Sequence, residues 1–272
     1  MSKTNLRIWD RISDEYGTQL TTSTSEVHFG VSIPGNDSLE LIPRVSQASA
    51  IDLGCGTGEN LVALAKLGYT VTGIDGSTRQ LELARMLLDA NGIKGELVLD
   101  NVCNLSWKSS ESFDLIISIG VMHFCSDIEG FLESCSKLAK TGTTLIVSVP
   151  HPLDMIVEVV EANNERMIIV NDYFPEKNRI EHGHYWEKFG GQLELAAGFS
   201  EYVYRPSDLI NSMIKYGFQI KGVHEPPVQM LDKAPCTYRN PEPWFIDVQS
   251  RRIPQNLIVE STYLRRPDKS QG

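Results

Sequence analysis

The sequence contains no run of about 20 apolar residues, the length that a membrane-spanning helix requires, so no membrane partner is predicted. Residues 1–17 lack the apolar segment of a secretory signal, and we expect a cytoplasmic protein. The cysteines are odd in number and form no C-x-x-C pair, which argues against a disulfide framework and a zinc knuckle. We therefore expect reduced thiols and no metal. The cysteines are Cys55, Cys103, Cys125, Cys135 and Cys236.

Positive charge is also scarce. The 25 Lys and Arg residues face 35 Asp and Glu residues, which gives a formal net charge of −10. Proteins that bind nucleic acid usually carry a basic stripe, so no nucleic-acid partner is predicted. Hydrophobic residues make up 41% and charged residues 22% of the chain, a composition that excludes disordered chains, collagens and coiled coils. The 272 residues suit one α/β domain with an insertion as well as they suit two domains.

Apolar runs alternate with amphipathic stretches from residue 48 onward. We expect strands at residues 50–53, 69–74, 96–99, 113–118, 143–149, 218–223 and 257–264. We expect helices after the glycines at 54–58 and over residues 80–91, 128–139 and 206–216. This alternation predicts an α/β fold, with a mostly parallel sheet and helices on both of its faces.

The alternation stops after Pro152. Residues 153–204 combine a helix-like stretch, 153–164, with many aromatic side chains, and we interpret them as a lid insertion. The predicted organisation is a helical cap at residues 1–44, a core at 45–152, the lid at 153–204, and the rest of the core at 205–266.

A glycine-rich loop follows the first predicted strand, in the order Asp52-Leu53-Gly54-Cys55-Gly56-Thr57-Gly58. Ligands of open α/β sheets bind beyond the carboxyl ends of the strands, and glycine lets a ligand approach the backbone closely. Asp75 ends the second predicted strand, where its carboxylate can accept both hydrogen bonds of a ribose diol. A dinucleotide site needs G-x-G-x-x-G, so the G-x-G-x-G spacing after an acid disfavours a nicotinamide oxidoreductase.

The stretch IDLGCGTGENLVALAKLGYTVTGIDGS resembles the nucleotide-binding half of class I S-adenosylmethionine-dependent methyltransferases. The resemblance continues through residues 113–118 and 143–150, and it covers most of residues 45–150. More loosely, Tyr204-Arg205-Pro206 and Tyr216-Gly217-Phe218 resemble small-molecule methyltransferases of the ubiquinone-biosynthesis type. The family resemblance implies a Rossmann-like, seven-stranded sheet whose last strand is antiparallel, and S-adenosyl-L-methionine as cofactor.

The resemblance also implies roles for residues of the glycine loop and the second strand. Asp52 supports the loop, Asp75 holds the ribose hydroxyls, and Gly76 turns the chain beside it. The glycines that pass the methionine part of the cofactor are Gly54, Gly56 and Gly58.

At the adenine end the sequence departs from the family, which usually has an acid after the third strand. That position falls on Asn101, so either the Asn101 amide or the preceding Asp100 takes over the contact with the adenine amine. Val102 would offer its backbone amide to the adenine ring. Ile119 would offer its carbonyl to the cofactor's ammonium group.

Two N-terminal features bear on the cofactor and on the acceptor. Trp9 and Tyr16 are seven residues apart and share one helix face. Tyr16 is a candidate to cover the sulfonium by a cation–π contact and to face the transferred methyl group, although both rings could serve core packing instead. His28 is a candidate for the acceptor site, and a surface histidine fits it equally well.

Further candidates follow the fourth and fifth strands and lie in the lid. His123 is the candidate general base or acceptor contact, and His151 is a second candidate for the acceptor. Tyr185 and Trp186 could stack on a planar acceptor. Each of these residues could instead have a structural role.

The sequence therefore predicts an enzyme that transfers a methyl group to an N or O atom of a small-molecule acceptor. Two alternatives stay open, a protein methyltransferase and a cofactor-binding module without catalysis. A nucleic-acid methyltransferase is disfavoured because residues 118–121 do not form an Asn/Asp-Pro-Pro-Tyr/Phe motif.

Overall fold

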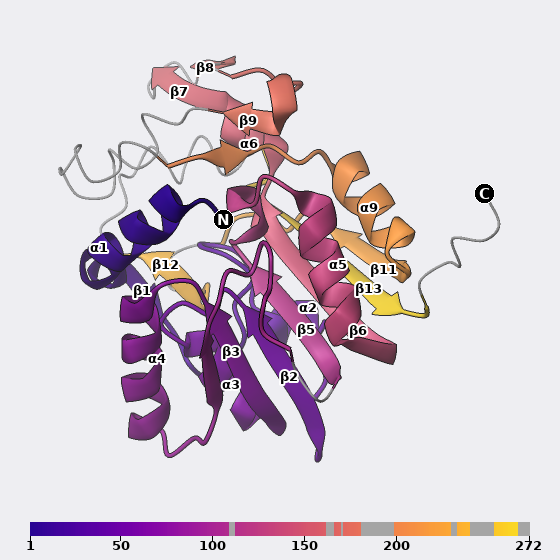
Figure 1. Cartoon of the computed structure of the whole chain (residues 1–272). Coiled ribbons are helices and arrows are strands. Elements are labelled where there is room, and N and C mark those ends of the chain that lie inside the picture. The colour runs from indigo at the N-terminus through magenta and orange to yellow at the C-terminus, as the bar shows by residue number, and fades with distance from the viewer. Residues whose placement is uncertain are drawn as a thin grey trace.

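The fold is described from a computed structural model of the whole chain (Figure 1). The described residues are 1–108, 112–161, 166–169, 171–180, 199–229, 233–239 and 253–265. Within them, a seven-stranded sheet has the strand order β11-β13-β6-β5-β2-β3-β4. Its strands are β2 (Ala48–Leu53), β3 (Tyr69–Asp75), β4 (Glu96–Leu99), β5 (Phe113–Ile119), β6 (Ala139–Pro150), β11 (Phe218–His224) and β13 (Asn256–Tyr263).

The first five of these strands are parallel, and the last strand in the chain, β13, pairs antiparallel with both β6 and β11. The predicted α/β sheet with an antiparallel last strand is confirmed. The chain runs from β2 outward to β3 and β4 and then returns to β5 on the other side of β2. The carboxyl ends of β2 and β5 therefore form the switch point at which ligands of open α/β sheets bind.

Alternate residues of the central strands face opposite layers of helices. Ile116 belongs to a core that includes side chains of α5 (Ile128–Leu138) and α9 (Pro206–Lys215). Its neighbours Leu115 and Ile117 belong to a second core, with side chains of α3 (Glu59–Lys66) and α4 (Thr78–Ala90). Because successive side chains of a strand point to opposite faces, a strand buried on both faces has the nearly continuous apolar pattern seen here.

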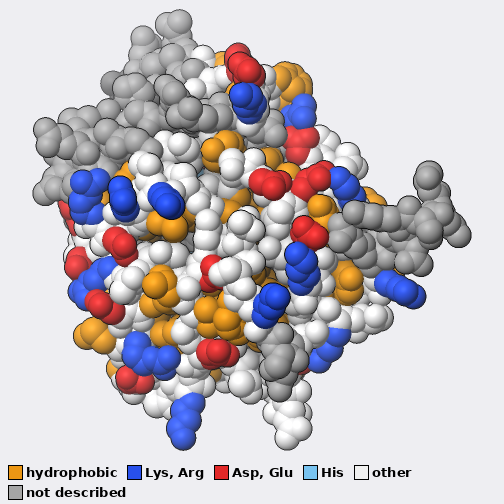
Figure 2. Space-filling view, in the orientation of Figure 1, with side chains coloured by type: hydrophobic (Ala, Val, Ile, Leu, Met, Phe, Trp, Pro, Cys, Tyr) orange, Lys and Arg blue, Asp and Glu red, His pale blue; other side chains and the backbone are white. Residues whose placement is uncertain are grey.

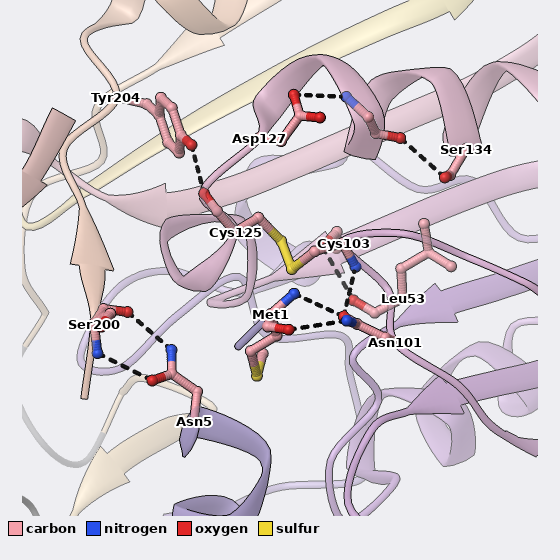
Figure 3. The surroundings of a disulfide bond; sticks show 12 residues. Met1, Asn5, Leu53, Asn101, Cys103, Cys125, Asp127, Ser134, Ser200 and Tyr204 are labelled. Carbon is pink, nitrogen blue, oxygen red and sulfur yellow. Dashed lines mark hydrogen bonds between the residues drawn. A yellow bond between two sulfur atoms is a disulfide. The ribbon is translucent and has the colours of Figure 1, made fainter. Parts of the chain in front are cut away.

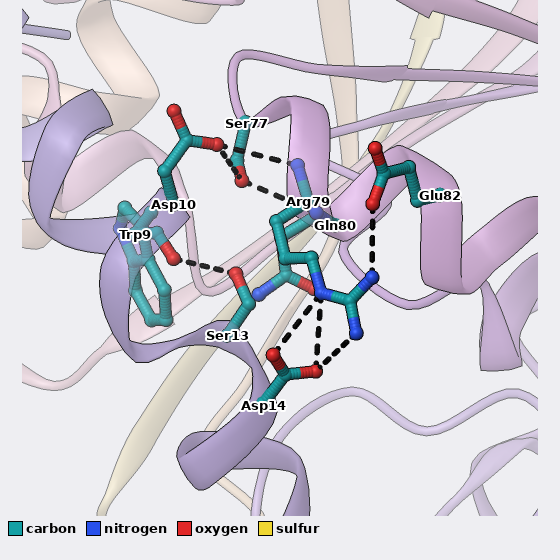
Figure 4. A network of polar contacts seen from close by, with 8 residues as sticks. All are labelled: Trp9, Asp10, Ser13, Asp14, Ser77, Arg79, Gln80 and Glu82. Carbon is teal, nitrogen blue, oxygen red and sulfur yellow. Dashed lines mark hydrogen bonds and ion pairs between the residues drawn. The ribbon is translucent and has the colours of Figure 1, made fainter.

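The N-terminal helix α1 (Lys3–Gln19) packs against α4, as Figure 4 shows. The Ser77 hydroxyl donates to Asp10 at 2.7 Å, and the Arg79 guanidinium pairs with Asp14 at 2.6 Å. The hydrogen bond from Arg79, assisted by its charge, lowers the pKa of the exposed Asp14 carboxyl. On the inner side of α1, the rings of Trp9 and Tyr16 meet edge-on at 5.2 Å, which confirms that they share a helix face.

A short two-stranded sheet joins two distant parts of the chain. It consists of β1 (Leu20–Thr22), directly after α1, and β12 (Cys236–Tyr238). The following turn is fastened to it, because the Ser32 amide donates to the Cys236 carbonyl at 2.7 Å. The turn leads into the short helix α2 (Asn36–Leu39).

The helix predicted over residues 153–164 is wrong beyond its first turn. The structure has α6 (Pro152–Ile156), followed by β7 (Val157–Glu161), which pairs antiparallel with β8 (Arg166–Ile169). The physical reason is the valine-rich sequence of residues 157–161, because β-branched residues favour strands. A second pair, β9 (Arg179–Ile180) and β10 (Glu201–Tyr202), lies nearby, and all four strands lie beyond the end of the sheet from which α6 departs (Figure 1).

Candidate cofactor-binding site

A cavity of about 460 Å³ lies at the switch point. One part of its lining, which we call the strand-end wall, consists of residues that follow β2, β3, β4 and β5. The other part, the cap wall, comes from residues of α1, β1, the turn 28–31, β12 and Arg239. The predicted site residues in the lining are Tyr16, His28, Asp52, Gly54, Gly56, Asp75, Gly76, Asn101, Val102 and Ile119. Gly58, His123 and His151 are not in this lining, and Tyr185 and Trp186 lie outside the described residues.

The three loop glycines are required for three different reasons, although all have positive φ. A Cβ on Gly54 would lie 2.3 Å from a Val121 methyl carbon, so Gly54 permits packing between the two loops. A Cβ on Gly58 would lie 3.1 Å from the Ala84 Cβ, so Gly58 lets α3 begin close against α4. A Cβ on Gly56 would meet only a Gln80 oxygen, at 3.8 Å. Gly56 is thus the glycine whose missing side chain leaves space in the cavity.

Asp75 is held at the cavity by the backbone. Its Oδ2 accepts the Gly56 amide at 3.0 Å, and its Oδ1 accepts the Ser77 amide at 2.9 Å. Burial raises the pKa of Asp75, and the backbone hydrogen bonds oppose this shift. A carboxylate offers about four lone-pair positions, so these two bonds leave room for two more donors. The Asp75 carboxylate can therefore accept a pair of hydroxyl groups from a ligand in the cavity.

Asp52 is buried at 3% exposure behind the loop, and its Oδ1 has no hydrogen-bond partner among the described residues. Burial, assisted by the charges of Asp75 and Glu59, raises the pKa of Asp52 to about 8. Desolvation of a carboxylate beside other carboxylates favours its neutral form. A cationic ligand would relieve this repulsion, so three acids at one wall suit a positively charged ligand.

The adenine end that the resemblance implies also has defined geometry. The Asp100 carboxylate accepts the amides of Ser106 and Trp107 at 2.7 and 2.6 Å, so it is occupied within its own loop. Asn101 and Val102 line the cavity, whereas Asp100 does not. The Asn101 side chain is also engaged, because its Oδ1 accepts the Met1 ammonium at 2.7 Å and its Nδ2 donates to the Met1 carbonyl at 2.9 Å. Position in the lining, and not a vacant side chain, therefore favours Asn101 over Asp100.

A disulfide between Cys103 and Cys125 connects this loop to the turn after β5 (Figure 3). The prediction of reduced thiols is therefore wrong for these two cysteines, although Cys55, Cys135 and Cys236 are free. No C-x-x-C spacing reveals this bond, because it joins residues 22 positions apart that the fold brings together. Because Val102 and Phe124 line the cavity, the disulfide fastens two neighbouring parts of its wall.

The candidate histidines have different surroundings. His28 lies in the cap wall, and its backbone N–H and C=O pair with the Asn60 side chain at 3.0 and 3.1 Å. His123, in the turn η1 (Met122–Phe124), lies beside the buried Glu201, with 3.6 Å between the His Nε2 and the Glu Oε1. His151 accepts the Leu153 amide at its Nδ1, and its Nε2 lies 2.9 Å from Glu225. His28 is thus the histidine that the described structure brings to the cavity.

Several lining residues were not predicted from the sequence. The most important are Arg239 and Cys236 at β12 and Gln80 at the start of α4. Gln80 follows the capping residue Ser77, a signal that places it near Asp75. No local signal marks Cys236, because its partner Thr22 lies 214 residues away.

The remaining surface carries mixed charge. Figure 2 shows basic and acidic side chains interspersed over the face it draws. Among the described residues, no group of three or more His, Cys, Asp or Glu side chains could hold a metal ion. None of the described helices combines the length and apolar character needed to cross a bilayer.

Comparison with known proteins supports this view of the site. Residues 51–147 match the family described as "Methyltransferase domain". The chain is 34% identical over 102 residues to the ubiquinone biosynthesis O-methyltransferase of Actinobacillus pleuropneumoniae, covering 36% of this chain and 44% of that protein. The enzyme of the same name from a Chelativorans strain is 31% identical over 98 residues, covering 36% of this chain and 38% of that protein. Residues 51–147 of the chain are therefore similar to methyltransferase domains.

Solved structures extend the fold likeness beyond this domain. A putative S-adenosylmethionine-dependent methyltransferase from Listeria monocytogenes superposes with a TM-score of 0.64 at 21% identity, covering 85% of this chain and 97% of that one. An S-adenosylmethionine-dependent methyltransferase from Mesorhizobium loti superposes with a TM-score of 0.60 at 22% identity, covering 82% of this chain and 94% of that one. The predicted resemblance to methyltransferases is confirmed for residues 51–147. The chain spans only about two fifths of the length of the curated relatives that it matches.

Proposed function

We propose that the protein is an S-adenosylmethionine-dependent methyltransferase that methylates an N or O atom of a small-molecule acceptor. The observation that carries the proposal is the arrangement of Asp75 and Gly56 in a cavity at the switch point. Asp75 keeps two lone-pair positions for a ribose diol, and Gly56 leaves space for a ligand against the backbone. The neighbouring sequence matches a methyltransferase domain, and the fold resembles solved S-adenosylmethionine-dependent methyltransferases.

The charges of the strand-end wall fit the same ligand. S-adenosylmethionine carries a sulfonium and an ammonium group, and the wall presents the carboxyl groups of Glu59 and Asp75, beside an Asp52 whose raised pKa a cationic ligand would lower. Asn101, Val102 and Ile119 line the cavity, which supports the roles at the adenine and the ammonium group that the family resemblance implies for them. When bound, the cofactor supplies an activated methyl group.

The chain's own residues would align the acceptor and exclude water. Trp9, Tyr16 and Phe124 bring aromatic surface to the cavity, which lowers the local polarity. An in-line methyl transfer disperses charge, so alignment in a dry cavity lowers its barrier. We retain Tyr16 as the residue that faces the methyl group.

An acceptor that must lose a proton also needs a base. His123 is the predicted base; its Nε2 lies 3.6 Å from the Glu201 Oε1, and although it is not in the cavity lining, its turn includes the lining residue Phe124. His28 is the alternative base at the cavity itself. The lid at residues 153–204, the remaining domain boundaries and the cytoplasmic location stay predictions.

The experiment that tests the proposal is calorimetric titration with S-adenosylhomocysteine, with NAD as the control ligand. We expect one-to-one binding of S-adenosylhomocysteine and none of NAD. Binding of NAD alone, or of neither compound, would contradict the proposal.

A second assay separates catalysis from mere binding and identifies the class of acceptor. The protein is incubated with methyl-labelled S-adenosylmethionine and a cell extract divided by ultrafiltration into small molecules and macromolecules. We expect label in products of the small-molecule fraction. Label in protein would indicate a protein methyltransferase, and no transfer despite binding would indicate a non-catalytic module.

A further inference from the structure

The cap wall is a connected structure, although its parts are far apart in the sequence. Thr22 pairs with Cys236 in the β1–β12 sheet, and the Ser32 amide donates to the Cys236 carbonyl. The Gln229 amide in turn donates to the Ser32 carbonyl at 2.8 Å. These hydrogen bonds hold β1, the turn after residue 27 and β12 in one register, so side chains at their ends have fixed places at the cavity.

The two walls carry opposite charges. The acids of the lining, Asp52, Glu59 and Asp75, all belong to the strand-end wall. In the described part of the chain, Arg239 is the only Arg or Lys side chain in the lining, and it belongs to the cap wall. Its Nη2 lies 3.4 Å from the Leu20 carbonyl oxygen, which directs the side chain along β1.

His28 gives the cap wall a second polar group without adding charge. Burial lowers the pKa of His28 to about 4, so the imidazole is neutral near pH 7. Its Nδ1 is buried without a hydrogen-bond partner among the described residues. Arg239 is therefore the one side chain of the described cap wall that presents a fixed positive charge to a ligand.

We infer that Arg239 binds a carboxylate in the cavity and that this carboxylate belongs to the methyl acceptor, an inference that rests on the proposed function. The planar guanidinium fork matches a carboxylate with two parallel hydrogen bonds. Among the described residues, no acid forms an ion pair with Arg239, and a positive charge in the same cavity disfavours a cationic methyl donor. An anionic acceptor bound to Arg239 would remove this repulsion. Bound at the cap wall, the acceptor would share the cavity with a donor held at the strand-end wall.

The same chemistry has a second possible source, because the cofactor also carries a carboxylate. The resemblance assigns the methionine part of the cofactor to the glycine loop, which lies in the strand-end wall. Arg239 lies in the other wall, and this favours the acceptor as the source. The test therefore needs one arm for each source.

The first arm compares benzoate with benzamide, a pair of probes that share shape and differ in charge. Their dissociation constants are measured by NMR titration, with and without saturating S-adenosylhomocysteine. We expect wild type to bind benzoate about fivefold more tightly than benzamide, a modest ratio because Arg239 is exposed. R239Q should lose the preference and R239K should keep part of it. R85Q, which alters an exposed arginine of α4, is the matched control and should behave as wild type.

The second arm compares S-adenosylhomocysteine with 5′-methylthioadenosine, which lacks the carboxylate. We expect R239Q to bind both as wild type does. If R239Q weakens S-adenosylhomocysteine alone, Arg239 holds the cofactor's carboxylate and the acceptor assignment is wrong. If wild type does not distinguish benzoate from benzamide, the carboxylate site itself is wrong. If wild type fails to bind S-adenosylhomocysteine, the proposed function fails, whereas the benzoate arm without cofactor still tests Arg239.

Discussion

The strand-end wall and the cap wall line one cavity, but they are built in different ways. In the strand-end wall, backbone amides hold the key carboxylate, as Gly56 and Ser77 do for Asp75. The cap wall is held by contacts between distant segments, such as the pairing of β1 with β12. The strand-end wall, held by backbone hydrogen bonds, suits a cofactor that stays the same. The cap wall, built from loops and short segments, can change in sequence to suit a different acceptor while the sheet is unchanged.

The largest effect is expected from Gly56→Val in the strand-end wall. A side chain at this position fills the space left for a ligand; its Cβ meets only Gln80 in the protein, although the positive φ of Gly56 adds backbone strain that lowers stability. Calorimetry should show no detectable binding of S-adenosylhomocysteine, with a cooperative thermal transition retained.

Gly54→Ala is the matched control for this change. Its Cβ would collide with Val121, so it should lower the free energy of unfolding by about 1–3 kcal/mol. Normal cofactor binding by Gly56→Val would show that the loop has only a structural role.

Asp75→Ala should have the next largest effect. It removes two charge-assisted hydrogen bonds to the ribose, each contributing about 1.5–3 kcal/mol. The affinity for S-adenosylhomocysteine should fall by about 100-fold or more. Asp75→Asn, which keeps the shape, should lose less, and an unchanged affinity in both variants would exclude Asp75 from the ribose site.

The double variant Cys103→Ser/Cys125→Ser tests the covalent link within the strand-end wall. Because the bond closes a loop of 22 residues, its loss should lower the free energy of unfolding by about 3 kcal/mol. Denaturant titration measures this change. Dithiothreitol should destabilise wild type to the same level and leave the double variant unaffected, whereas insensitivity of wild type would mean that the bond does not form.

Asp52 makes stability depend on pH. The pKa of Asp52 is about 8 in the folded protein and near 3.8 in the unfolded chain. Between these two pH values the folded state keeps a proton that the unfolded state has released. The free energy of unfolding should therefore fall as pH rises from 4 to 8, by at least about 1 kcal/mol in total. Asp52→Asn should give a flatter profile in denaturant titrations at several pH values, and identical profiles would contradict the assigned shift.

Arg79→Gln should have the smallest effect. The ion pair between Arg79 and Asp14 is exposed, so its loss should change stability by less than about 1 kcal/mol. Because the pair joins α1 to α4, the cap wall should still loosen slightly and S-adenosylhomocysteine affinity should fall a few-fold. A large loss of stability would mean that α1 is part of the cooperative core.

The same difference between the walls explains what the sequence could predict. The sheet and the positions of Asp75 and Gly56 follow from local patterns, because alternating strands and helices and a glycine loop are contiguous in the chain. The role of Gly54 in packing on Val121 was not visible, because that contact joins two separate loops.

The sequence contains no comparable local pattern for the residues of the cap wall. Arg239 reaches the cavity only because β12 pairs with β1, and the strand propensity of so short a segment is weak. The Cys103–Cys125 bond depends on two turns that meet only in the folded sheet. At residues 157–161, the β-branched composition outweighed the apparent helical spacing.

The most direct test of the two-wall account is a crystal structure of the protein with S-adenosylhomocysteine. The account predicts both ribose hydroxyls within about 3.2 Å of the Asp75 carboxylate, with the homocysteine chain passing Gly56. It also predicts that Arg239 and His28 make no contact with the cofactor. A ribose bound away from Asp75, or a cofactor carboxylate on Arg239, would contradict the division of the cavity into a cofactor wall and an acceptor wall.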